Sequence, residues 1–189
     1  MDLNTTYGPA QADSDVTNQR DAPSGEISFT TGESPLGIML VARSANGVCA
    51  ILIGSESAEL TADLAARFPE NTLVRNDRKL DGDLKKIVRF IETPARGLDL
   101  ELDIYGTPFQ RRVWEALCGI PAGRTVTYAA LARRIGEPGS VRAVANACAA
   151  NALALAIPCH RVVRSDGTLS GYHWGVERKR AMIEREAPV

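Results

Sequence analysis

Two adjacent side chains, Cys159 and His160, are the residues of this sequence best suited to chemistry. They lie in the stretch IPCHRVV, residues 157–163, where a proline precedes them and a β-branched run follows, which predicts a constrained turn that leads into a strand. A deprotonated thiol is a strong nucleophile, but a free cysteine has a pKa of about 8.5 and needs help to lose its proton. Neighbouring side chains of an extended segment point apart, so we expect a water molecule to relay the proton between the two. A buried, inert thiol beside a satisfied core histidine is the competing interpretation.

The remaining cysteines do not add a metal site. Cys49, Cys118 and Cys148 are scattered without CxxC spacing, and the sequence holds only two histidines. Structural zinc ligands usually occur in closely spaced pairs, and nucleotide cofactors usually need a glycine-rich loop. Because the sequence has neither pattern, we expect neither a metal nor a cofactor. Scattered thiols, together with the lack of an apolar run of about 18 residues, favour a reduced, cytoplasmic protein.

Charge divides the 189 residues into an acidic front part and a basic back part. Residues 1–103 carry 10 Lys and Arg against 17 Asp and Glu, whereas residues 104–189 carry 12 against 6. A basic block of this size favours a polyanionic partner such as nucleic acid. A solvated basic surface explains the same numbers, so charge alone leaves both interpretations open. The apolar fraction of 44% excludes a wholly disordered chain.

The front part, residues 26–104, has the pattern of a small α/β unit. Before it, residues 1–25 are polar and aperiodic, which predicts a mobile tail. Asn46-Gly47 stands between two apolar runs and is a strong hairpin signal. Strands are expected at 27–31, 37–43, 47–53 and 98–104, and helices at 57–68 and 81–92. These elements predict a mostly antiparallel sheet with helices packed on it.

A helical unit is expected over residues 105–189. Thr107, Pro108 and Gln110 form the pattern of a helix start with a capping box. Helices are expected at 108–118, 128–135 and 141–150, the last two capped by Thr127 and Ser140. Two short helices around a glycine-containing break are typical of a helix-turn-helix, although a plain helical hairpin has the same periodicity.

The helix at 141–150 has an unusual composition for a DNA-reading helix. It carries one long side chain, Arg142, among alanines and other small residues. Most of these side chains are too short to reach base edges, so such a helix would bring its backbone close to a shallow groove while the arginine projects. An alanine-rich packing helix with a surface arginine is the competing interpretation.

Four stretches of the back part resemble the methylated-DNA–protein-cysteine methyltransferases, also called O6-alkylguanine-DNA alkyltransferases. They are GRTVTYAALARRIG at 123–136, VRAVANACAAN at 141–151, PCHRV at 158–162 and SDGTLSGYHWGVERK at 165–179. The resemblance covers residues 105–186 strongly and the front unit loosely, and it is greatest to the C-terminal half of the bacterial adaptive-response regulators. It implies an α/β (α+β) fold, with a small N-terminal antiparallel-sheet domain and a C-terminal helix-turn-helix domain that carries Cys159.

The resemblance also implies a role for each matching residue. Cys159 matches the nucleophile that accepts the alkyl group, His160 the residue that acts on it through water, and Glu186 the group that polarises this histidine. Asn151 matches a hinge before the active-site strand, and Tyr128 matches a residue that crowds the target phosphate. The residues expected to contact DNA are Arg142, Tyr128, Thr127, Ala143 and Ser165. The residues expected to line the guanine pocket are Cys148, Val162, Tyr172 and His173.

The implied activity is transfer of an alkyl group from O6-alkylguanine, and from O4-alkylthymine, in duplex DNA to Cys159. The alkyl carbon points into the base stack, so the nucleotide must be flipped out, and Arg142 would fill the gap. No second cysteine adjoins Cys159 to remove the group, which favours a single turnover. We also expect the protein to be a monomer. His173 and Trp174 stand where relatives have small residues, so we expect a narrower pocket. The alternative is a non-reacting module of the same fold that binds alkylated bases.

Overall fold

The computed structural model describes residues 25–169 and 171–187, and almost all of the expected tail at 1–25 lies outside these residues. The front part forms a four-stranded sheet with the strand order β3-β2-β1-β4. Its elements in chain order are β1 (Glu26–Ser34), β2 (Gly37–Arg43), β3 (Val48–Gly54), α1 (Ser57–Arg67), β4 (Thr72–Arg75) and α2 (Asp77–Glu92). The pairs β1–β2 and β2–β3 are antiparallel and β1–β4 is parallel, so the expected mostly antiparallel sheet is confirmed.

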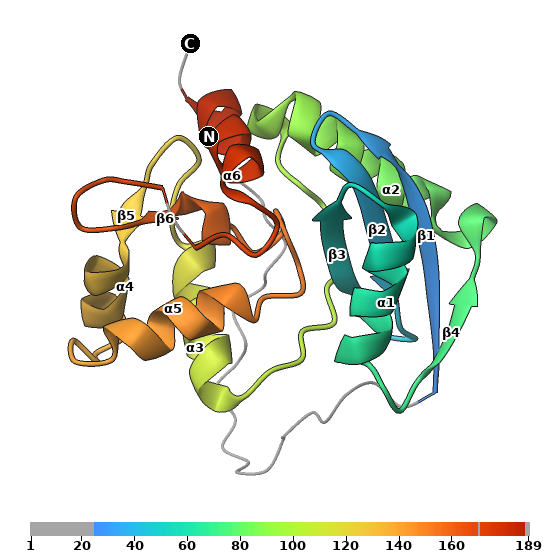
Figure 1. Cartoon of the computed structure of the whole chain (residues 1–189), viewed down its shortest axis with the longest axis horizontal. Helices are drawn as coiled ribbons and strands as arrows, with labels where there is room; N and C mark the ends of the chain where they lie inside the picture. The colour runs from blue at the N-terminus through green and yellow to red at the C-terminus, as the bar shows by residue number, and fades with distance from the viewer. Residues whose placement is uncertain (1–24, 170, 188–189) are drawn as a thin grey trace.

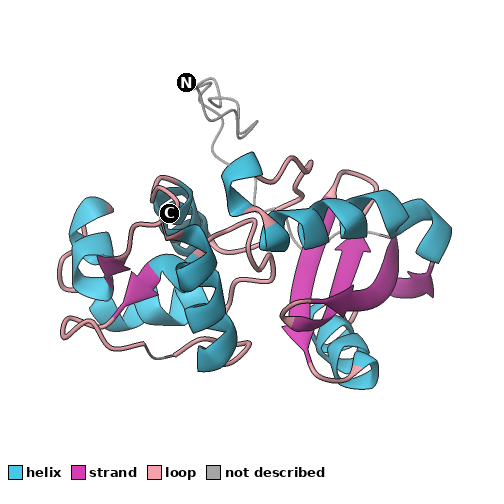
Figure 2. Ribbon diagram, turned by 90° about the horizontal axis from the view of Figure 1, so that it is seen from above, coloured by secondary structure: helices cyan, strands magenta, loops and turns pink. Residues whose placement is uncertain are grey.

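Helices α1 and α2 cover opposite faces of this sheet (Figures 1 and 2). Six of the seven residues of β3 are buried in succession, because the strand is covered on both sides. The Asn46-Gly47 hairpin lies between β2 and β3 as expected. Helix α2 begins four residues before the expected start at Asp81, because the Asn76 side chain accepts a hydrogen bond from Lys79 N at 3.1 Å and caps the helix there. Strand β4 was not predicted.

The strand expected at 98–104 is wrong. Only one isolated bridge forms there, between Val48 and Leu102. The alternating pattern predicts that Asp103 faces solvent, yet its side chain is buried and accepts hydrogen bonds from the hydroxyls of Ser44 and Tyr105. This buried polar cluster holds the segment against the β2–β3 hairpin in place of a regular ladder.

The back part is helical, with one short parallel pair of strands. The front part ends with the short turn η1 (Pro94–Arg96). The described elements of the back part are α3 (Pro108–Cys118), β5 (Val126–Thr127), α4 (Tyr128–Arg134), α5 (Val141–Ala149), η2 (Cys159–Arg161), β6 (Val162–Val163) and α6 (Val176–Glu186). The capping box of Thr107 with Gln110 and the cap of Thr127 on Ala130 N are confirmed. The cap expected from Ser140 is wrong, because its hydroxyl donates to Glu137 Oε2 at 3.0 Å instead of accepting from the helix. Helix α6 was not predicted.

Direct contacts join the two parts. Ile51 of β3 donates its N–H to Ala152 O at 2.8 Å and accepts from Ala154 N at 3.0 Å, so the segment after α5 lies along the sheet edge. Trp114 Nε1 donates to Ala147 O at 2.8 Å and holds α3 on α5. One cluster of buried apolar residues runs through both parts. The α/β fold class is therefore confirmed, while a domain boundary at Tyr105 stays a prediction.

No helix among the described residues is both long enough and apolar enough to cross a bilayer.

Candidate active site

Cys159 begins the short 3-10 turn η2, which leads directly into β6. The side chain of Asn151, at the end of α5, donates from Nδ2 to Cys159 Sγ at 3.2 Å and to Ile157 O at 3.0 Å. The Oδ1 atom of the same amide accepts from Leu153 N at 2.9 Å. Both Asn151 and Cys159 are buried, with exposed fractions of 0% and 3%. The amide thus fixes the thiol relative to the end of α5.

His160 and Glu186 are buried, and together with the partly buried Arg161 they form a hydrogen-bonded group next to Cys159 in the chain. His160 Nε2 lies 2.9 Å from Glu186 Oε1, and Arg161 donates to both carboxylate oxygens, from Nε at 2.9 Å and from Nη2 at 2.8 Å. A carboxylate accepts hydrogen bonds, so Nε2 carries the proton of the neutral ring and Nδ1 keeps a lone pair. His160 Nδ1 is buried and has no hydrogen-bond partner among the described residues. The ring is therefore oriented as a proton acceptor.

The pKa values of this group agree with an ionised carboxylate beside a neutral imidazole. Burial disfavours the charge of Glu186, but its hydrogen bonds with His160 and Arg161 and the charge of Arg161 outweigh this effect and lower its pKa to about 2. Burial lowers the pKa of His160, although Glu186 opposes this. Burial raises the pKa of Cys159 to about 11, against the opposing effects of the Asn151 hydrogen bond and the Lys179 charge. The resting thiol is thus protonated and needs a base to become a nucleophile.

Tyr128 is brought beside the thiol by the small sheet, in which Thr127 pairs with Val163. Burial, with the nearby thiols of Cys148 and Cys159, raises the pKa of Tyr128 to about 12. Its hydroxyl therefore stays protonated and is able to donate. A Cβ added at Gly171 would lie 3.7 Å from the Tyr128 hydroxyl, so the loop before α6 approaches it closely.

Lys179 is a site residue that the sequence reasoning missed. It is fully buried, and its Nζ lies 6.0 Å from the ring centres of both Tyr128 and Tyr172. Its charge lowers the pKa of Cys159 and of Cys148, although burial raises both on balance. The available signal was the spacing of Lys179, Met182 and Glu186, which places all three on one face of α6.

Three of the four residues expected to line a guanine pocket are buried, and the fourth, His173, is exposed and lies next to α1. Val162 and Tyr172 are buried, and burial raises the pKa of Cys148, which is close to Cys159, to about 12. The His173 ring lies outside this group, at 3.0 Å from Arg67 Nη2 on α1.

Apart from Tyr128, the residues expected to contact DNA are not gathered around the thiol. Arg142 and Ala143 are exposed on α5, and Ser165 is exposed in the loop after β6. Thr127 is half-buried, and its hydroxyl is engaged in capping α4. The exposed face of α5 is thus made of small side chains with one long arginine, as expected.

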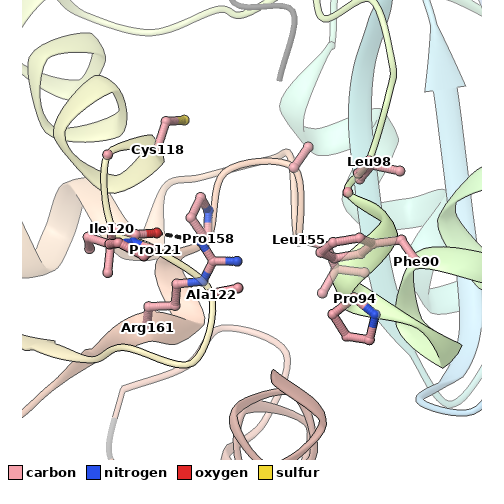
Figure 3. Close-up of a pocket in the computed structure, with 13 residues that line it drawn as sticks. Phe90, Pro94, Leu98, Cys118, Ile120, Pro121, Ala122, Leu155, Pro158 and Arg161 are labelled. Atoms are coloured by element: carbon pink, nitrogen blue, oxygen red, sulfur yellow. Dashed lines mark hydrogen bonds between the residues drawn. The ribbon is translucent and has the colours of Figure 1, made fainter. Parts of the chain in front are cut away.

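A cavity of about 310 Å³ lies next to η2, between the two parts of the chain. Figure 3 shows Phe90, Pro94 and Leu98 on one side of it and Ile120, Pro121 and Arg161 on the other. Arg161 Nη1 donates to Ile120 O at 2.5 Å within one wall of the cavity. Cys159 is not among the lining residues, so this cavity is separate from the thiol.

The buried carboxylate should make the stability of the protein depend on acid pH. The pKa of Glu186 is about 2 when folded against an ordinary value of 4.5, so its stabilisation is complete above pH 4.5 and is lost as the pH falls toward 2. The contribution is on the order of 3 kcal/mol. The pKa of His160 is also lowered from its ordinary value of 6.5. Its contribution to the free energy of unfolding therefore also falls with pH, and this loss begins below pH 6.5. We expect urea unfolding at pH 7, 4 and 3 to show this loss in the wild type.

Glu186→Gln should be less stable at pH 7 and lose much less on acidification. The matched control is Glu184→Gln, because Glu184 is exposed on the same helix. If the wild type and Glu186→Gln lose stability in parallel between pH 4.5 and 3, the assignment of an ionised Glu186 is wrong.

Residues 108–188, from α3 to beyond α6, match the family model described as 6-O-methylguanine DNA methyltransferase, DNA binding domain. This match, together with a thiol that Asn151 contacts and the His160–Glu186 pair next to it in the chain, places the protein in a class that has a DNA binding domain.

Relatives of known name identify the family within this class. The chain is 34% identical to a methylated-DNA–protein-cysteine methyltransferase of Candida albicans, with 84% of this chain and 95% of the relative covered. It is similar to the crystal structure of a Mycobacterium tuberculosis OGT in complex with DNA, with a TM-score of 0.66, 32% identity and coverage of 86% and 95%. The chain belongs to the family of methylated-DNA–protein-cysteine methyltransferases, which confirms the resemblance seen in the sequence.

A longer relative is also similar. The chain is 44% identical to the bifunctional transcriptional activator/DNA repair enzyme Ada of Escherichia coli K12, over 98% of this chain and 53% of the relative. The chain thus spans about half the length of this protein.

Proposed function

We propose that this protein repairs DNA by moving the alkyl group of O6-alkylguanine to the sulfur of Cys159, once per molecule. The observation that carries this proposal is the orientation of the Cys159 thiol and the His160 ring on η2. Asn151 holds the Cys159 thiol, and Glu186 fixes the neighbouring His160 with its Nδ1 lone pair free of hydrogen-bond partners among the described residues. The pKa of Cys159 is raised to about 11, so its thiol is protonated at neutral pH. A base must remove this proton before the sulfur can attack, and His160 Nδ1 is oriented to accept it.

The proposed reaction is an in-line displacement in which atoms and charges balance. The thiol proton passes through a bridging water to His160 Nδ1, and the Cys159 sulfur attacks the alkyl carbon. The S–C bond forms as the bond from that carbon to O6 of guanine breaks. Tyr128 donates a proton to the leaving guanine, and the proton held by His160 replaces it through solvent. Over the whole reaction the thiol proton ends on guanine and the alkyl group on sulfur.

DNA binding is expected through α5, which follows α4 in the helix-turn-helix. Its exposed small side chains allow the backbone to approach a groove, and Arg142 is long enough to enter the space of a flipped base. We further infer that the substrate is duplex DNA, that O4-alkylthymine also reacts, that the protein acts as a monomer in the cytoplasm, and that residues 26–104 and 105–189 form two domains.

Intact-protein mass after incubation with a duplex containing O6-methylguanine tests the proposal. We expect the gain of one methyl group, mapped by peptide fragmentation to Cys159, and no gain with the unmodified duplex. A protein that binds the methylated duplex and gains no mass would instead be the non-reacting module of the same fold. Equal binding of both duplexes without any adduct would contradict both alternatives.

Arg142→Ala should slow transfer from duplex DNA about tenfold. Flipping the nucleotide out of the duplex costs a few kcal/mol, and without Arg142 no side chain fills the space that the base leaves. Transfer from the free base O6-methylguanine should stay unchanged, since nothing has to be flipped. The measurement is the single-turnover rate with each substrate. Arg180→Ala is the control, because Arg180 is also an exposed arginine and its contact with Glu177 on α6 is long, at 3.7 Å. Equal slowing on both substrates would contradict the role of Arg142.

A further inference from the structure

Residues 172–175, here called the pocket turn, lie beside the proposed site. The hydrogen bond from Gly175 N to Tyr172 O at 3.0 Å closes the turn. The rings of Tyr172 and Trp174 pack edge to face with centres 5.2 Å apart, so the turn forms one packed unit. Tyr172 reaches the group around Lys179 and Tyr128, and the preceding Gly171 faces the Tyr128 hydroxyl. A shift of the turn therefore changes the space next to Cys159.

The front unit contacts the pocket turn first through Arg67, the last residue of α1. Arg67 Nη2 lies 3.0 Å from His173 Nε2, and Arg67 Nε donates to Asp63 Oδ1 at 3.0 Å. Asp63 Oδ2 also lies 3.4 Å from His173 Nε2, so Arg67, Asp63 and His173 form one polar cluster. Arg67 Nη1 also reaches Ala150 O at 3.5 Å, just after α5. One side chain of the front unit thus contacts both the pocket turn and the end of the helix that precedes Asn151.

Arg178 makes the second connection. Its Nη1 donates to Trp174 O at 2.9 Å, its Nε to Leu36 O at 2.7 Å and its Nη2 to Ser55 Oγ at 3.1 Å. Leu36 lies in the turn between β1 and β2, and Ser55 directly follows β3. The carbonyl of Trp174 is therefore tied through Arg178 to two separate points of the front unit.

Few other polar contacts hold the side chains of the pocket turn. The Tyr172 hydroxyl and Trp174 Nε1 are buried and have no hydrogen-bond partner among the described residues. Their position is set by packing and by the two arginine contacts. Cys159 is only 3% exposed. The space available for an alkyl group next to its sulfur therefore depends on the position of the pocket turn.

We propose that the front unit determines which alkyl groups the site accepts, by holding the pocket turn in place through Arg67 and Arg178. This inference rests on the proposed function. With both contacts made, the turn stays close to the thiol and favours a methyl group. When either contact is lost, the turn moves outward more easily. The transfer rate of a bulky alkyl group should then rise relative to the rate for a methyl group.

The test compares transfer from two free bases, O6-methylguanine and O6-benzylguanine, so that DNA affinity does not enter. In Arg67→Ala and in Arg178→Ala we expect the ratio of the benzyl rate to the methyl rate to rise about fivefold. The control for the first variant is Lys85→Ala, which removes an exposed ion pair with Asp81 on α2. The control for the second is Arg180→Ala on α6. Both controls should keep the wild-type ratio.

A rescue experiment separates positioning from general destabilisation. His173→Ala should raise the ratio as Arg67→Ala does, and the double variant should raise it no further. His173→Gln keeps an acceptor for Arg67 and should restore the wild-type ratio. If Arg67→Ala and Arg178→Ala slow both substrates equally, lower the melting temperature and leave the ratio unchanged, the inference is wrong.

Amide hydrogen exchange of the free protein distinguishes this failure from failure of the proposed function. Arg67→Ala and Arg178→Ala should increase exchange over residues 171–176, and the two controls should not. A wild type that reacts with neither base and with no methylated duplex refutes the proposed function. A wild type that reacts, with unchanged ratio and exchange in the variants, refutes only the inference about the front unit.

Discussion

Cys159→Ala is expected to abolish alkyl transfer while binding of methylated duplex DNA stays within about twofold. The sulfur is the atom that forms the new bond in the proposed reaction, so no residual rate should remain above background. The fold should tolerate the change, because the thiol is small and Asn151 Nδ2 keeps its second acceptor, Ile157 O. Intact-protein mass measures the transfer, and fluorescence anisotropy with a labelled methylated duplex measures the binding.

Cys118→Ala is the matched control for this prediction. Cys118 is an exposed cysteine that lines the cavity next to η2, and Cys159 does not line this cavity. Its replacement should leave both transfer and binding as in the wild type. A methyl adduct that appears on any residue of Cys159→Ala at the wild-type rate would show that the acceptor has been misassigned.

His160→Ala is expected to slow transfer by about 10² to 10³ at pH 7, within the range typical of general base catalysis. The pKa of Cys159 is raised to about 11, so without His160 the thiol depends on hydroxide from solvent. The rate of the variant should then rise about tenfold per pH unit between 7 and 9, because the thiolate fraction does so below the pKa. The wild type should be much less dependent on pH in this range, since neutral His160 is present throughout it.

Glu186→Gln gives an independent test of the same proton path. A neutral amide no longer fixes the His160 tautomer or stabilises the ring when it takes a proton, so the rate should fall by about tenfold or more. Circular dichroism and thermal melting show whether each variant is folded at the temperature of the assay. Rates within threefold of wild type in both folded variants would mean that the Cys159 proton leaves by another route.

Several features of this fold follow from residues that are close together in the chain. The capping box of Thr107 with Gln110, the cap of Thr127 and the Asn46-Gly47 hairpin were predicted because each needs partners only a few positions apart. The place of Cys159 on a turn before a strand was predicted for the same reason. The family was also evident from the sequence, because its motifs are contiguous stretches.

Contacts between distant segments could not be predicted in this way. Residues 98–104 alternate like a strand, yet Asp103 is buried because Ser44 and Tyr105 provide hydrogen bonds that no alternation pattern reports. Lys179 is a charged residue in a helix that was not predicted, and only the packing of α6 buries it near the thiol.

By itself, the sequence determined which residues carry the chemistry, the local caps and turns that shape their segments, and the family. Only the tertiary structure decided how the His160 ring is oriented, that Lys179 faces the site and that Arg67 of the front unit reaches His173. The physical reason is that caps and turns depend on hydrogen bonds over a few residues. A proton path or a pocket wall depends on the distance between segments that the chain brings together only when its core is packed.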